Sequence, residues 1–144
     1  MIVGIVGCGA IANTMVNEIM SEKGIEIKYF YDRDVERAEN LAHIANGIAV
    51  IELEDMLDKV DLIVESASPM ALKDIAIPIL EKGVDLMVMS VGALMDNEFR
   101  EKVHNTAQKN KAKVYAPSGA IVGLDGIKAA SIGKITQASL TTRK

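Results

Sequence analysis

Short apolar runs alternate with amphipathic segments along most of the chain. The runs fall at residues 2–6, 25–31, 48–51, 61–65, 84–89 and 113–116, and they predict strands buried on both faces of a parallel sheet. Between them, apolar residues spaced three or four apart predict helices over 13–22, 34–45, 52–59 and 68–82, and another from residue 96 onward. Six strands that alternate with helices predict an α/β fold, a doubly wound parallel sheet of order 3-2-1-4-5-6.

The helical segments also predict which side chains face the sheet. In the first helix Ile11, Met15 and Ile19 recur every four residues, with Val16 and Met20 beside them. The inner residues of the later helices are predicted to be Ala38, Leu41, Ala42 and Ala45, then Leu72, Ile75, Ala76, Ile79 and Leu80, and then Phe99, Val103 and Ala107.

Several helix ends carry recognisable capping residues. Ser68 followed by Pro69 predicts a helix start in which a hydroxyl caps the first amides and proline takes the first helical position. Gly83 is expected to end that helix, and Asp96 to cap the next one.

A glycine turn, residues 7–12 (GCGAIA), joins the first strand to the first helix. Strand, turn and helix together form the context of a dinucleotide-binding fingerprint. Gly7 permits the tight turn, Gly9 lets backbone amides approach a pyrophosphate, and Ala12 keeps the helix close to the strand. The positive end of the helix dipole then faces the phosphates. The predicted cofactor contacts here are Gly7, Cys8, Gly9, Ala10 and Ile11.

Asp32 follows the second apolar run, 20 residues after Ala12 (32 − 12 = 20). At this distance an acidic residue reaches the adenosine ribose hydroxyls, although Asp32 could instead cap the next helix. Its charge disfavours a 2′-phosphate, whereas the neighbouring Arg33 could accept one. NAD is the predicted cofactor, and use of NADP as well is compatible with this pair.

Small residues, several of them serines, follow three further strands at the edge where ligands bind in such sheets. Ser66 and Ala67 follow the fourth strand, Ser90 follows the fifth, and residues 118–120 follow the sixth. Ser66, Ala67 and Ser90 are predicted to contact the cofactor, and capping of a helix or turn is the alternative for each serine. For Glu65 we favour an internal hydrogen-bonding role over acid catalysis.

Composition limits the classes of function. The chain has 144 residues, a formal net charge of −4 and 3% aromatic residues, so we expect no nucleic-acid partner. One cysteine excludes an internal disulfide. The N-terminal run has no basic flank and is interrupted by Gly7 and Gly9, so it predicts neither a signal peptide nor a membrane span. We therefore expect a cytoplasmic protein.

No residue is an obvious acid/base catalyst. His43 and His104 lie within helices, away from the strand ends, which favours surface or packing roles. Cys8 is expected to be a small buried thiol, because redox chemistry requires a lowered thiol pKa. The spacing of His, Cys and carboxylate residues matches no metal site, so we predict none.

The sequence changes character after Pro117. Residues 1–117 form the predicted NAD(P)-binding domain, and residues 118–144 form the predicted start of a second α+β domain, a substrate or dimerisation domain. A short helical run to residue 132 and a strand over 135–140 are expected there. Since a lone final strand leaves an edge unpaired, either a partner chain or a longer protein would cover it.

Four segments together resemble the L-aspartate dehydrogenase family: residues 7–12, 65–68 (ESAS), 90–93 (SVGA) and, most specifically, 118–125 (SGAIVGLD). The ending LTTRK, 140–144, is similar to that family as well. The resemblance covers the whole chain but only a little over half of a usual family member. It implies NAD(P)-dependent oxidative deamination of L-aspartate to iminoaspartate, or reductive amination of oxaloacetate with ammonia, which in some organisms feeds NAD biosynthesis.

The same resemblance implies a backbone contact from Ala120 to the cofactor near the nicotinamide, and a homodimer. It places the family's catalytic histidine and a cofactor-binding asparagine beyond Lys144, so neither His43 nor His104 inherits the catalytic role. We therefore expect this chain to bind NAD and to turn over aspartate slowly or not at all unaided. The alternatives are another dehydrogenase, such as homoserine dehydrogenase, and a non-catalytic NAD(H)-binding redox sensor.

Overall fold

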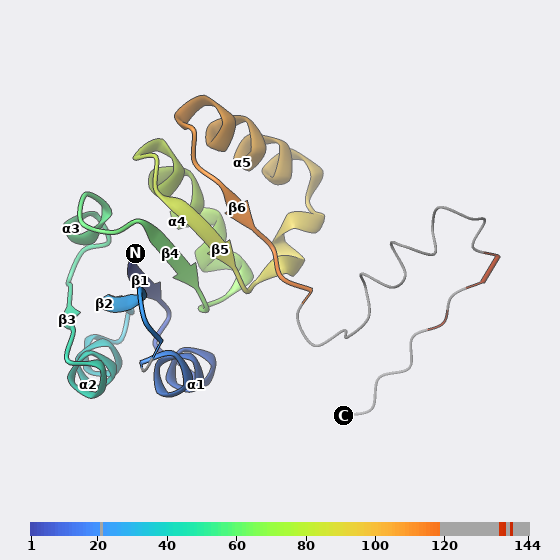
Figure 1. The fold of residues 1–144 in the computed structure, drawn as a ribbon. Helices are drawn as coiled ribbons and strands as arrows, with labels where there is room; N and C mark the ends of the chain where they lie inside the picture. The colour runs from blue at the N-terminus through green and yellow to red at the C-terminus, as the bar shows by residue number, and fades with distance from the viewer. Residues whose placement is uncertain (21, 119–135, 138, 140–144) are drawn as a thin grey trace.

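The computed structural model describes residues 1–20, 22–118, 136–137 and 139, and it contains a six-stranded, wholly parallel sheet (Figure 1). The strands are β1 (Ile2–Val6), β2 (Glu26–Tyr31), β3 (Ile48–Ala49), β4 (Leu62–Glu65), β5 (Asp85–Val88) and β6 (Val114–Tyr115). Their order, β3-β2-β1-β4-β5-β6, confirms the predicted topology. The helical run predicted up to residue 132 lies outside the described residues, as do residues 135, 138 and 140 of the strand predicted over 135–140. The described residues of that segment, 136, 137 and 139, belong to no strand.

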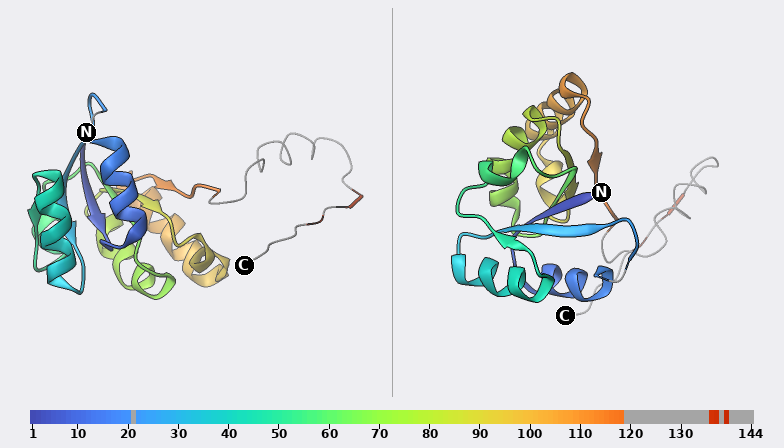
Figure 2. Two further views of the ribbon diagram at one scale, coloured as in Figure 1. Left: turned by 90° about the horizontal axis from the view of Figure 1, so that it is seen from below. Right: turned by 60° about the vertical axis from the view of Figure 1, so that its left-hand side comes forward.

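The helices are α1 (Ala10–Ile19), α2 (Val35–Ala45), α3 (Glu54–Leu57), α4 (Pro69–Glu81) and α5 (Asn97–Asn110), with a short 3-10 helix, η1 (Val91–Met95). α1 and α2 lie on one face of the sheet, and α4 and α5 lie on the other (Figures 1 and 2). Each face therefore has its own aliphatic core. Because strand side chains alternate, Ile63 of β4 packs under α4, whereas Leu62 and Val64 pack with α1 and α2.

The inner face of α1 differs from the prediction. Ala12 and Val16 are fully buried, whereas Ile11 and Met20, expected inside, are 50% and 53% exposed. The prediction that Ile11 and Met20 face the sheet, made from the spacing of large apolar residues, was therefore wrong. A small residue, Ala12, lies against the sheet because α1 starts directly at the glycine turn and runs close to the strands. Residues 15 and 19 pack at the margin of the core.

The predicted helix ends are confirmed. The Ser68 hydroxyl accepts a hydrogen bond of 3.2 Å from the Ala71 N–H, and Asp96 accepts one of 3.2 Å from the Phe99 N–H. Gly83 follows α4 with a φ of +75°, a conformation that glycine adopts without strain. The inner faces predicted for α2, α4 and α5 are buried or partly buried as expected.

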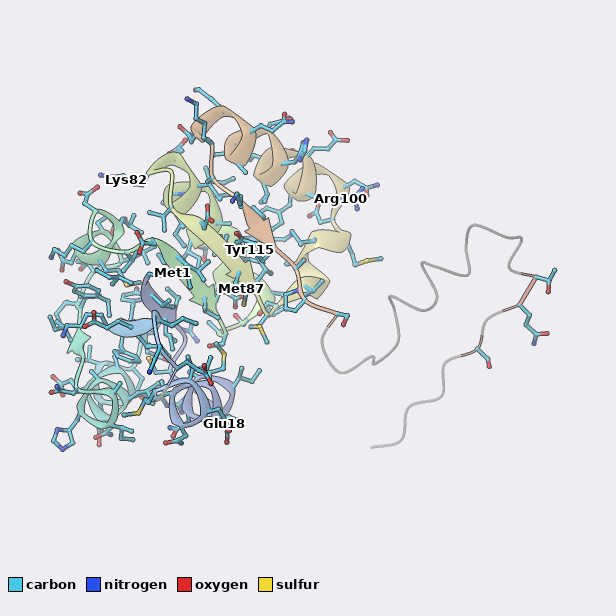
Figure 3. The ribbon with its side chains drawn as sticks, in the orientation of Figure 1. Met1, Glu18, Lys82, Met87, Arg100 and Tyr115 are labelled. Carbon is cyan, nitrogen blue, oxygen red and sulfur yellow. The ribbon has the colours of Figure 1, made fainter. Side chains whose placement is uncertain are left out.

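The sheet is covered less completely at β5 and β6. Met87 and Tyr115 are paired in register and lie side by side in Figure 3. Tyr115 is 41% exposed, whereas Leu86 and Val88 point to the opposite face and are fully buried in the core that includes α4 and α5. This end of the sheet therefore buries one face more completely than the other.

Candidate cofactor-binding site

The glycine turn between β1 and α1 packs directly on the loop that follows β4. Gly7 has a φ of +91°, and a Cβ added to it would lie 2.6 Å from the backbone Cα and N atoms of Ala67. The Gly7 carbonyl also accepts a hydrogen bond of 2.7 Å from the Ser66 hydroxyl. Both the backbone conformation and the close packing therefore require glycine at position 7.

Gly9 has a different environment. Its φ is −86°, which any residue adopts, and an added Cβ would meet nothing within 4 Å. Gly9 is the N-cap of α1, and no side chain caps that helix end. The first amides of a helix lack intrahelical partners and attract anions, so the open space beside Gly9 suits a phosphate group. Neither the conformation of Gly9 nor its packing against protein atoms requires glycine here.

Asp32, just after β2, contacts the glycine turn from the other side. One carboxylate oxygen, Oδ2, accepts a hydrogen bond of 2.7 Å from the Cys8 N–H, and Oδ1 accepts one of 2.9 Å from the Asp34 N–H. Asp34, not Asp32, is the N-cap of α2. Because each carboxylate oxygen carries two lone pairs, both can still accept hydrogen bonds from ribose hydroxyls.

A cleft of about 270 Å³ opens between the glycine turn, the end of β2 and the start of α4. Six of the predicted cofactor contacts line it: Gly7, Gly9, Asp32, Arg33, Ser66 and Ala67. A small-molecule site of this kind is concave and carries a few polar groups that fix orientation. The cleft therefore brings together the residues predicted to bind the pyrophosphate and the residues predicted to bind the ribose.

Four predicted contacts do not line the cleft: Cys8, Ala10, Ile11 and Ser90. Cys8 is buried, and its N–H donates to Asp32. Burial first, and the nearby Asp32 carboxylate second, raise the pKa of the Cys8 thiol to about 12. These observations agree with the buried-thiol interpretation. Ala120, the remaining predicted contact, lies outside the described residues.

Sequence reasoning missed several lining residues, among them Arg37 on α2 and Ala71, Asp74 and Ile75 on α4. Arg37 lies four residues after Arg33, in the first turn of α2, and its Nε forms an ion pair of 3.1 Å with the Asp34 carboxylate. Ala71 and Asp74 follow Ser68 at steps of three residues, which places all three on one side of α4. This spacing could have identified them, but only once the helix ends were known.

Ser90 is held by the buried carboxylate at the end of β4. Glu65 is fully buried, and it accepts hydrogen bonds from the Ser90 N–H and hydroxyl and from the Ala67 N–H. These contacts agree with the internal hydrogen-bonding role favoured for Glu65. His43 and His104 are exposed on α2 and α5, and neither lines the cleft.

Other site types are not supported within the described part of the chain. No group of three or more His, Cys, Asp or Glu side chains among the described residues is placed to hold a metal ion. None of the helices described there has both the length and the apolar character needed to cross a bilayer.

A parallel sheet of this order, with a glycine turn before the first helix and a carboxylate after the second strand, defines a dinucleotide-binding α/β domain. The model of the family described as "Homoserine dehydrogenase, NAD binding domain" matches residues 7–117, and the chain belongs to this family of NAD-binding domains.

Curated relatives of the chain include L-aspartate dehydrogenases that match it over its whole length, so the family resemblance found in the sequence is confirmed. The enzyme of that name from Methanothermobacter thermautotrophicus is 55% identical over 100% of this chain and 56% of its own length. The one from Methanococcus maripaludis is 43% identical over 99% of this chain and 54% of its own length. The chain thus spans about half the length of the curated relatives it matches.

Solved structures agree with the fold. The aspartate dehydrogenase of Thermotoga maritima matches with a TM-score of 0.70 and 32% identity, over 92% of this chain and 52% of that one. GenD2 from gentamicin A biosynthesis, solved in complex with NAD, matches with a TM-score of 0.78 at 15% identity, over 92% of this chain and 38% of that one. The second likeness concerns the fold alone.

Proposed function

We propose that this chain is the cofactor-binding part of an L-aspartate dehydrogenase, which oxidatively deaminates L-aspartate with NAD. The observation that carries the proposal is the 55% identity to such an enzyme across the whole chain. The cleft supports it, because a glycine turn, an open helix N-terminus and a carboxylate with free lone pairs meet in one place.

Each group of the cleft has a proposed role. The first amides of α1, beside Gly9, bind the pyrophosphate, and Asp32 accepts hydrogen bonds from the adenosine ribose. Ser66 and Ala67, in the loop after β4, line the cleft beside the glycine turn. The bound nicotinamide would accept the hydride from the substrate, while the protein supplies binding and orientation.

The cleft also supports use of NADP. The guanidinium-bearing residues Arg33 and Arg37 both line it close to Asp32. Arginine binds phosphate through paired N–H donors, so these side chains can offset the repulsion between Asp32 and a 2′-phosphate. We propose NAD as the preferred cofactor and NADP as a second one.

Several finer assignments complete the proposal. The domain boundary is placed after residue 117, Ala120 contacts the cofactor near the nicotinamide, and Cys8, Ala10, Ile11 and Ser90 complete the cofactor site. The protein acts as a homodimer in the cytoplasm, and its single cysteine forms no internal disulfide that would call for an oxidising compartment.

Titration with NADH, followed by the fluorescence of the reduced nicotinamide, tests cofactor binding. The chain contains no tryptophan, so protein emission interferes little. We expect saturable binding, and no binding at millimolar NADH by folded protein would overturn the proposal.

The substrate is tested by NAD reduction with L-aspartate and with L-homoserine, using the natural protein that carries this sequence. The family description makes homoserine the relevant competitor. Turnover of L-aspartate and not of L-homoserine is expected, and the reverse preference would assign the chain to a homoserine dehydrogenase. Cofactor binding without turnover of either would favour a redox sensor.

A further inference from the structure

Glu65, the last residue of β4, is the one charged side chain among the described residues that is fully buried. Burying a carboxylate is costly unless hydrogen bonds replace its hydration. Glu65 lies next to the cofactor cleft but does not line it. Its position therefore calls for an explanation other than direct contact with the cofactor.

Three donors converge on the Glu65 carboxylate. Oε1 accepts hydrogen bonds of 2.8 Å from the Ala67 N–H and 2.7 Å from the Ser90 hydroxyl, and Oε2 accepts one of 3.0 Å from the Ser90 N–H. The two backbone N–H groups and the Ser90 hydroxyl all donate to the carboxyl oxygens of Glu65, so these hydrogen bonds replace its lost hydration.

The two partners of Glu65 belong to different loops. Ala67 lies in the loop after β4, where it lines the cleft and touches the glycine turn at Gly7. Ser90 begins the segment after β5, ahead of η1. The Glu65 carbonyl additionally accepts a hydrogen bond of 2.9 Å from the Met89 N–H. One residue thus ties together the ends of β4 and β5.

A dinucleotide lies across the carboxyl ends of such a sheet, with one mononucleotide half over each half of the sheet. Asp32 and the glycine turn serve the adenosine half. The ends of β4 and β5 belong to the other half, which receives the nicotinamide riboside. The spacing of the Ala67 and Ser90 loops therefore shapes the nicotinamide side of the site.

We propose that Glu65 is a positioning residue that sets this spacing and so preforms the nicotinamide side of the cofactor site. The inference rests on the proposed cofactor function and deepens it. Glu65 acts through Ala67 and Ser90 and makes no contact with the cofactor itself. Its loss should therefore weaken binding of the whole dinucleotide more than binding of the adenosine diphosphate half alone.

The test compares dissociation constants for NADH and for ADP, which lacks the nicotinamide riboside. In Glu65→Gln the amide NH₂ must face at least one backbone N–H, so one buried donor loses its acceptor. We expect NADH binding to weaken about tenfold and ADP binding to change less than about threefold. Thermal melting establishes that the variant is folded.

Ser90→Ala is the second variant, because it removes one of the three hydrogen bonds and keeps the Ser90 N–H contact. We expect NADH binding to weaken about threefold and ADP binding to stay unchanged.

Equal effects on NADH and ADP in the folded variants would overturn the inference. If Glu65→Gln does not fold, an unchanged NADH-to-ADP ratio in Ser90→Ala overturns it. Equal affinity of the wild-type protein for ADP and NADH would also overturn the inference. A wild-type protein that binds neither ligand would instead contradict the proposed function.

Discussion

The Asp32 carboxylate and the Cys8 backbone N–H form a hydrogen bond of 2.7 Å that joins the end of β2 to the glycine turn. The residue proposed to hold the ribose therefore also holds the loop proposed to hold the pyrophosphate. Cofactor affinity and loop geometry should consequently depend on the same side chain.

Replacing Asp32 with alanine removes both the proposed ribose contact and this link. We expect Asp32→Ala to weaken NADH binding about 10- to 100-fold, because a charged hydrogen-bonding group and an ordered loop are lost together. NADPH binding should weaken less, since the repulsion between Asp32 and the 2′-phosphate disappears. Fluorescence titrations with both cofactors measure the difference.

Arg37→Ala, at the same end of the cleft as Asp32→Ala, should affect the two cofactors in the opposite order. It should weaken NADPH binding and leave NADH binding within about twofold, because only NADPH carries the 2′-phosphate that Arg37, which lines the cleft, is proposed to bind. Equal losses for both cofactors in the two variants would contradict the assigned adenosine site.

Gly9→Ala distinguishes the packing of the protein at position 9 from the approach of the cofactor phosphates to it. An added Cβ meets nothing within 4 Å and the backbone φ is unstrained, so the melting temperature should stay within about 2 °C of wild type. The methyl group would nevertheless fill the space proposed for the pyrophosphate, and NADH binding should weaken at least about tenfold. Asn17→Ala, at an exposed position on the same helix, is the control for affinity and stability. Wild-type affinity in Gly9→Ala would place the phosphates elsewhere.

The raised pKa of the Cys8 thiol predicts a pH-dependent stability. Burial raises this pKa from 9.0 to about 12 in the folded protein. Between these values the unfolded chain releases the proton and the folded chain retains it, so the free energy of unfolding falls as the pH rises above 9. The stabilisation linked to the protonated Cys8 thiol is fully present below pH 9. Each pH unit above pH 9 should lower the folding equilibrium constant up to about tenfold.

Denaturant titrations at pH 8 and pH 10 measure this effect, with Cys8→Ser as the control that lacks the thiol. The control should lose less stability between the two pH values than the wild type does. The folded wild type should also react slowly with iodoacetamide, because the buried thiol stays protonated. Rapid modification of the folded protein at pH 8 would contradict the structure.

Ser68→Ala tests the cap of α4. The Ser68 hydroxyl accepts the Ala71 N–H, so its loss should lower the free energy of unfolding by about 1 kcal/mol. Asp34→Ala is the comparison variant, because Asp34 is the N-cap of α2 but its side chain makes no capping hydrogen bond and only an exposed ion pair with Arg37, which contributes little. Chemical denaturation compares the two, and equal losses would show that the hydroxyl contributes nothing as a cap.

Much of the fold follows from local patterns in the sequence. Uninterrupted apolar runs and helical periodicity predicted the six strands and their order, since the handedness of parallel crossovers leaves few alternatives. Gly7 was predictable as well, because a tight turn of this kind needs a residue without a side chain. The caps at Ser68 and Asp96 were equally local, since each side chain contacts an amide three residues later.

The contacts between distant segments were decided by the tertiary structure alone. Packing angles and strand register determined that Asp32 accepts a hydrogen bond from the Cys8 N–H and that Glu65 accepts one from the Ser90 hydroxyl. They also determined that Arg37 lines the cleft. The close approach of α1 to the sheet likewise left Ile11 in solvent. Sequence periodicity encodes which residues avoid water and where the backbone turns. It carries no information on which buried donors and acceptors meet, because that depends on the three-dimensional separation of elements that are far apart in the chain.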